Sequence, residues 1–84
     1  MNNTVMRKIT VTGTYQPLST SPLVASVTIS TPPSNLSNVL FQGDNGSHVP
    51  WVPGEWHDFR SIDLALVKVK GTPGDVVTVI GGTW

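Results

Sequence analysis

Five carboxylates and two histidines are the side chains of this chain with the types needed for acid–base or metal chemistry. Glu55 and Asp58 lie three positions apart, and glycoside hydrolysis requires two carboxyl groups a few ångströms apart. His48, His57 and Asp58 offer nitrogen and oxygen ligands for a metal ion. Their spacing follows no ligand rule, and 84 residues leave little room for a substrate cleft. We therefore interpret these histidines and carboxylates as surface residues.

The remaining sequence offers no catalytic motif. Asp44 and Asp75 lie in predicted turns, where an Asp side chain accepts hydrogen bonds from its own backbone. The chain has no cysteine, no Gly-x-Ser-x-Gly sequence and no glycine-rich loop leading into a helix, so the usual nucleophile and phosphate-binding motifs are missing. We predict that the protein is not an enzyme and has no catalytic residue, no cofactor and no metal site.

Three tryptophans are more than the core of so small a domain is expected to hold. Trp51 is flanked by prolines and Trp84 is the last residue of the sequence. We predict that at least one of them is an exposed anchor, because Trp is a favoured residue at protein interfaces. The alternative is that Trp56 lies in the core while the other two cover the open ends of the fold. Aromatic rings also stack on sugars, so a carbohydrate-binding role stays open.

The elements that position these residues are predicted to be short β-strands. Apolar and polar residues alternate along them, which is the pattern of half-buried strands. In the segment from residue 24 to 30, for example, Ala25, Val27 and Ile29 are expected to face inward. The predicted strands span residues 5–13, 24–30, 38–42, 55–59, 67–70 and 76–80.

The last two predicted strands are expected to form a β-hairpin. The turn between them is Thr72-Pro73-Gly74-Asp75, in which Pro73 presets its own φ and Gly74 accepts a positive φ, as a type II turn requires. The second arm is apolar on nearly both faces, so we expect it inside the sheet.

Prolines interrupt the strands and define the connections. The segment from Tyr15 to Leu23 is predicted to be an extended connection, pinned by Leu18 and Leu23. Pro50 and Pro53 confine their segment to an edge strand or a loop. Because no helical period is present, the sequence predicts one all-β domain over residues 1–84: a small antiparallel β-sandwich or barrel-like, jelly-roll-like fold of six to eight short strands.

Composition limits the partners. The formal net charge is zero and 12% of residues are charged, which argues against nucleic acid or an anionic membrane as partner. No apolar run is long enough for a signal peptide or a membrane span, so we expect a soluble protein made in a cytoplasm. A domain of this size without disulfides has a marginal core, and oligomerisation is the common remedy.

Short motifs follow one another in a characteristic order and spacing over nearly the whole chain past the first strand. In this arrangement they resemble a group of small structural proteins of tailed bacteriophages with short β-rich domains. The chain departs from the pattern at Val49-Pro50-Trp51 and at Gly81-Gly82-Thr83-Trp84. The matching motifs are Gln16-Pro17-Leu18, Ser21-Pro22-Leu23, Val27-Thr28-Ile29, Asn35, Gly43-Asp44, Pro53-Gly54-Glu55, Ile62-Asp63-Leu64, and Gly71 with Gly74-Asp75-Val76.

The resemblance implies a virion component made in the host cytoplasm: a capsid decoration or cement protein, or else a fibre or tail accessory. It implies a homo-oligomer, often a trimer, that binds the major capsid protein or another virion protein and carries no catalytic residues. The alternative is a carbohydrate- or receptor-binding module that uses Trp51 and Trp56 as a stacking platform.

We expect the contacts to come from the connection at residues 16–23 and the loop at residues 48–56, because proline stiffens both and lowers the entropy lost on binding. Trp51→Ala is expected to weaken association without unfolding the domain. The candidate interface residues are Pro17, Leu18, Pro22, Pro50, Trp51, Trp56 and Trp84.

Overall fold

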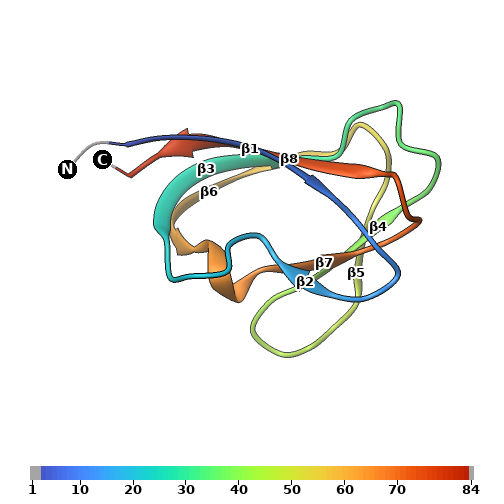
Figure 1. The fold of residues 1–84 in the computed structure, drawn as a ribbon, viewed down its shortest axis with the longest axis horizontal. Helices are drawn as coiled ribbons and strands as arrows, with labels where there is room; N and C mark the ends of the chain where they lie inside the picture. The colour runs from blue at the N-terminus through green and yellow to red at the C-terminus, as the bar shows by residue number, and fades with distance from the viewer. Residues whose placement is uncertain (1–2, 84) are drawn as a thin grey trace.

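The structure, a computed structural model, describes residues 3–83. Two four-stranded antiparallel sheets stack in a sandwich-like arrangement (Figure 1), which confirms the all-β prediction. The one helical element among the described residues is a 3-10 turn, η1 (Leu64–Leu66). The strands are β1 (Thr4–Thr10), β2 (Gln16–Pro17), β3 (Val24–Ser30), β4 (Val39–Gln42), β5 (Val49–Trp51), β6 (Trp56–Asp63), β7 (Lys68–Lys70) and β8 (Val76–Gly82).

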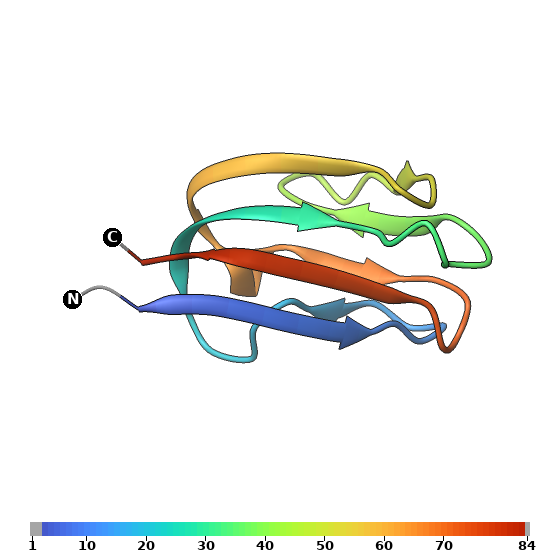
Figure 2. The same ribbon diagram turned by 90° about the horizontal axis from the view of Figure 1, so that it is seen from above.

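The strand pairs are nested along the chain. Sheet A has the order β1-β8-β3-β6, which Figure 2 shows side by side, and sheet B has the order β2-β7-β4-β5. The first strand pairs with the last, β2 with β7, β3 with β6, and β4 with β5, all antiparallel. Two further pairs, β3 with β8 and β4 with β7, complete the sheets. The chain therefore folds back on itself as one long hairpin, and its four strand pairs are divided between the two sheets.

The core lies between the sheets and follows the alternation of the sequence. Ala25, Val27 and Ile29 of β3 are buried, as predicted, while the residues between them are only partly covered. The second predicted arm, β8, lies inside sheet A between β1 and β3, also as predicted. The buried apolar residues are Val5, Val11, Leu18, Ala25, Val27, Ile29, Val39, Phe41, Trp51, Leu64, Val69, Val77 and Val79.

The predicted hairpin at residues 67–80 is wrong, although its turn is present. Gly74 has a φ of 99°, and Asp75 N donates to Thr72 O at 3.0 Å. The two arms, however, enter different sheets, because β7 pairs with β2 and β4 while β8 pairs with β1 and β3. Tight hairpins favour type I′ or II′ turns, whereas a type II geometry splays the flanking strands. The turn therefore passes the chain from one sheet to the other.

A buried carboxylate holds this crossing against the loop that follows β3. Asp75 accepts hydrogen bonds from Leu36 N at 3.0 Å and Ser37 N at 3.1 Å, so it serves a distant segment rather than its own turn. The Asn35 side chain donates to Val76 O at 2.8 Å and accepts from Val76 N at 2.9 Å. These bonds satisfy backbone groups that would otherwise be buried without partners.

The two sheets differ at their edges. Both edge strands of sheet B contain a proline, Pro17 in β2 and Pro50 in β5, which confirms the edge or loop expected for Pro50. The edge strands of sheet A, β1 and β6, have seven and eight residues and no proline. The β3–β6 register shifts between Ala25 and Val27, near Ser61, whose φ is 51°. This irregularity marks a β-bulge in the second half of β6.

Candidate functional site

Trp51 is buried in the core, which corrects its place among the candidate interface residues. Its side chain is 6% exposed and stacks on Phe41, with ring centroids 3.8 Å apart and planes at 16°. The Phe59 ring lies parallel to it, at 6.4 Å. Pro50 places β5 at the sheet edge, but the next residue of a strand points to the opposite face, so Trp51 faces the core.

Trp56 is exposed, and this overturns the alternative that it lies in the core. Its side chain is 61% exposed and begins β6, opposite Ser30 of β3. A platform made of Trp51 and Trp56 together is therefore not available on the surface. Trp56 is the one tryptophan among residues 3–83 that an external partner can reach.

The outer face of sheet A presents two rows of side chains across the four strands. The first row runs from Lys8 through Thr78 and Ser30 to Trp56. It is polar apart from Trp56, and the Ser30 and Thr78 hydroxyls hydrogen-bond each other at 2.5 Å.

The second row of the outer face runs from Met6 through Ile80 and Thr28 to Asp58. Met6 is 72% exposed and Ile80 is 53% exposed, so two neighbouring strands present apolar side chains to solvent. At the other end of the row, Thr28 Oγ1 donates to Asp58 Oδ1. Sequence reasoning missed Met6 and Ile80 as exposed apolar residues. The available signal was strand alternation, because the residues on either side of each point inward and the apolar side chain between them must then point outward.

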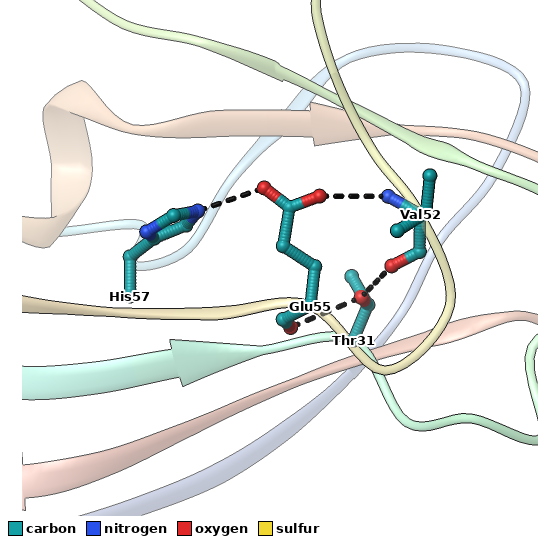
Figure 3. Close-up of polar contacts among 4 residues, drawn as sticks. All are labelled: Thr31, Val52, Glu55 and His57. Carbon is teal, nitrogen blue, oxygen red and sulfur yellow. Dashed lines mark hydrogen bonds and ion pairs between the residues drawn. The ribbon is translucent and has the colours of Figure 1, made fainter.

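Glu55 and His57 form a polar cluster where β5 turns into β6 (Figure 3). Glu55 Oε2 lies 2.7 Å from His57 Nε2, and Glu55 Oε1 accepts from Val52 N at 3.0 Å. Thr31 Oγ1 donates to the carbonyls of Val52 and Glu55, at 2.8 and 3.2 Å. The His57 ring meets Trp51 edge-on at 4.8 Å. The cluster therefore braces the β5–β6 turn against the core.

The hydrogen bond between Glu55 and His57, with a second from the Val52 N–H, lowers the pKa of the Glu55 carboxyl below its ordinary value. Both bonds favour the ionised carboxylate. Glu55 and Asp58 do not form a pair, because Glu55 binds His57 and Asp58 alternates with His57 along β6. The two carboxylates point to opposite faces of the strand.

The three candidate metal ligands have three different partners. His48 Nδ1 bonds the Tyr15 hydroxyl, His57 bonds Glu55, and Asp58 bonds Thr28. The Tyr15 and His48 rings also stack at 5.5 Å. Within residues 3–83, no group of three or more Asp, Glu or His side chains is arranged to hold a metal ion.

The remaining predicted interface residues divide between core and surface. Leu18 is buried, because its side chain anchors the connection that follows β2, so it is not available to a partner. Pro17 is partly buried in β2, whereas Pro22 and Pro50 are exposed. Trp84 lies outside the described residues.

A groove opens between the end of β6 and the turn after β4. It has a volume of about 550 Å³, and its lining is mainly apolar. A smaller hollow of about 240 Å³ adjoins it and reaches Trp51 and Phe59. The groove therefore lies at the far end of β6. Its lining residues are Gly43, Asp44, Ile62, Asp63, Leu66, Val67 and Lys68.

No protein-family model, curated protein or solved structure matches this chain. Within the part of the chain that the structure describes, no helix is long and apolar enough to cross a membrane.

Proposed function

We propose that the chain is a structural component of a phage virion, a capsid decoration or cement protein that acts by adhesion and without catalysis. The observation that carries the proposal is the nesting of β1 with β8, β2 with β7, β3 with β6 and β4 with β5 across two sheets. This connectivity supports a jelly roll, an architecture used by viral capsid domains and also by lectins. The step from fold to function is an analogy, which the surface must support.

The outer surface supports an adhesive role. Met6 and Ile80 form an apolar pair on sheet A, and Leu36 is 85% exposed in the loop after β3. With a net charge of zero, the chain does not repel a neutral or weakly charged shell. Burying these side chains against the major capsid protein would stabilise the contact by about 25 cal/mol per Å² of apolar surface. Copies at symmetry-related positions would then raise the cost of separating capsomers.

The loops that we propose contact the virion are those whose prolines are exposed. Pro22 in the connection after β2 is exposed, and Pro50 and Trp56 are exposed around β5 and β6. Self-association into a homo-oligomer, often a trimer in the resembling proteins, would multiply these contacts on one particle. Leu18 and Trp51 are not part of this surface, because both are core residues.

The test is to look for the protein in particles. Virions from the strain that encodes the chain are purified by density gradient and labelled with an antibody against the chain. We expect the protein in the particle fraction, with regular labelling of the head. Met6→Asp with Ile80→Asp is expected to release it, whereas Lys8→Asp in the neighbouring row is the matched control. Protein present in the lysate and absent from gradient-purified particles would refute the virion role.

Sugar binding is a second candidate, favoured by the exposed Trp56. The ring lies on the outer sheet face near Asp58 and Ser30, so a sugar stacked on it would meet a carboxylate and a hydroxyl. This site differs from the predicted platform because it uses one tryptophan.

Tryptophan fluorescence tests this second candidate. Cello-, malto- and chito-oligosaccharides are titrated into the protein, and a binding sugar is expected to quench the emission in a saturable way. The Trp56→Ala variant should lose the response, whereas Trp56→Tyr should keep binding. A response that persists in Trp56→Ala would place any sugar site elsewhere.

A further inference from the structure

The four edge strands of the two sheets are not equally suited to pairing with another chain. Pro17 and Pro50 remove backbone donors from the two edges of sheet B, and prolines there prevent strand addition. Strand β1 carries Arg7 and Lys8 and no carboxylate. A β1 strand paired with a second copy of itself would bring like charges together. These edges are therefore protected against self-pairing.

Strand β6 is the edge strand that is not protected against self-pairing. It carries one negative and one positive side chain two positions apart. Asp58 and Arg60 alternate with Phe59 and project from the opposite face of the strand. Thr28 Oγ1 donates to Oδ1 of Asp58, and no hydrogen bond from a described residue reaches Oδ2. Among residues 3–83 the one ion pair is Glu55 with His57, so Arg60 has no carboxylate partner.

One antiparallel register of β6 with a second β6 makes these charges complementary. If Phe59 lies opposite Phe59 of the second copy, Asp58 lies opposite Arg60 of the second copy, and Arg60 opposite its Asp58. Opposite charges at directly facing positions stabilise an antiparallel pair. The two neighbouring registers that keep the same faces aligned set Asp58 against Asp58 or Arg60 against Arg60, and both are unfavourable. The sequence of β6 therefore selects one register.

The surroundings of β6 also fit a second copy. Trp56 is 61% exposed at the start of the strand, and Phe59 and Ile62, further along it, are partly buried and pack against the core. The apolar groove of about 550 Å³ lies at the far end of the strand, where Ile62 lines it. Figure 2 shows β6 as the outermost strand along one long side of the molecule. The register with β3 is regular from Trp56 to Phe59, and the bulge falls at Arg60 and Ser61, so Asp58 lies in the regular half of β6 and Arg60 at its boundary.

We propose that two copies of this chain associate through β6 about a two-fold axis, joining their A sheets into one eight-stranded sheet with Phe59 at its centre. Two Asp58–Arg60 pairs across the axis set the register. The inference does not depend on a virion role, since it concerns the purified chain alone. It predicts a dimer, whereas the phage resemblance implies a homo-oligomer that is often a trimer.

Charge exchange at the two positions tests the proposal. Solution mass is measured by light scattering over a dilution series for the wild type, Asp58→Arg, Arg60→Asp and the double exchange. Each single variant places like charges opposite each other twice, so we expect its dimerisation Kd to rise roughly tenfold or more. The double exchange restores complementarity and should dimerise like the wild type. Circular dichroism checks that every variant keeps its β spectrum.

Mixing the two single variants gives the most specific result. Asp58→Arg carries two cations and Arg60→Asp carries two carboxylates, so an equimolar mixture should form a heterodimer more tightly than either variant forms a homodimer. Lys8→Asp, on the other edge of sheet A, is the matched control and should leave the dimer unchanged. A wild type that is monomeric or trimeric at all concentrations would overturn the proposal. So would single variants that dimerise normally, or a Lys8→Asp variant that dissociates.

Discussion

At the residue scale, burial separates two tryptophans that the sequence presents as alike. Trp51 and Trp56 are five positions apart, yet one is 6% exposed and the other 61%. Strand alternation decides the difference. Trp51 follows an outward-facing proline in β5, whereas Trp56 begins β6 on the outer side of sheet A, opposite Ser30. Their energetic roles are therefore opposite.

Substituting each tryptophan should reveal this difference. Trp51→Ala removes a ring that stacks on Phe41 and leaves a cavity, so we expect the free energy of unfolding to fall by about 3–5 kcal/mol. Trp56→Ala removes an exposed ring and should change it by about 0.5 kcal/mol or less. Urea unfolding at constant protein concentration measures both. Equal losses for the two variants would contradict the difference in burial.

Glu55 provides a prediction for pH. Its pKa in the folded protein lies below the ordinary value of 4.5, because His57 and the Val52 N–H bond the carboxylate. A lowered pKa contributes stability above pH 4.5 and loses it as the pH falls through the folded-state pKa. Acid therefore weakens the brace at the β5–β6 turn.

An NMR titration of the Glu55 side-chain carboxyl checks this directly. The midpoint should lie below 4.5 in the wild type and move towards 4.5 in His57→Phe. His48→Phe is the control, because that ring contacts Tyr15 and should leave the Glu55 midpoint unchanged. An unaltered midpoint in His57→Phe would mean that the histidine does not stabilise the carboxylate.

At the scale of the elements, the contact between β3 and β8 depends on a glycine. A Cβ built on Gly81 would lie 2.0 Å from Ser26 O and 2.6 Å from Val27 Cα. Both are backbone atoms of the paired strand, so a side chain at this position must push the two strands apart. The pair lies at the centre of sheet A, where β8 bonds β1 on its other side.

Gly81→Ala is therefore expected to destabilise the domain by about 3 kcal/mol or more, the upper range for overpacking. Thermal unfolding followed by circular dichroism measures the effect. Gly13→Ala is the control, since a Cβ at Gly13 would have nothing within 4 Å and the φ of this residue is not positive. Comparable melting temperatures for the two variants would show that the strands adjust without cost.

At the scale of the whole molecule, nested pairing brings the two ends of the fold together. Thr83 N donates to Asn3 O at 3.0 Å, and Asn3 N donates to Thr83 Oγ1 at 2.9 Å. Strands β1 and β8 are the most distant elements in sequence and lie side by side (Figure 1). Contacts of this sequence separation make folding slow, on the order of milliseconds to seconds.

A circular permutant tests this arrangement. Joining residue 84 to residue 1 with a short Gly/Ser linker and opening the chain between Asn45 and Gly46 keeps every strand pair intact. We expect the unfolding free energy to change by about 1 kcal/mol, because loop closure depends weakly on length. Urea unfolding measures it. Opening instead between Pro73 and Gly74 should cost more, since Asp75 and Asn35 hold that crossing in place.

Local pattern was sufficient for much of this protein. The alternation in residues 24–30 determined which side of β3 is buried, and Pro50 indicated an edge position, because both follow from the two-residue period of a strand and the missing donor of proline. The Thr72–Asp75 turn was also predictable from Pro73 and Gly74. These features depend on neighbouring residues only.

Only the tertiary structure decided which strands pair and which side chains meet. Val69 and Val77 lie on either side of one turn, but they face the same core from different sheets. The alternation of apolar and polar residues fits this arrangement as well as it fits a hairpin within one sheet. The meeting of Glu55 with His57, and of Trp51 with Phe41, depends on the same long-range packing. Strand period specifies which face of a strand is apolar, and the choice of partner depends on contacts between segments far apart in the chain.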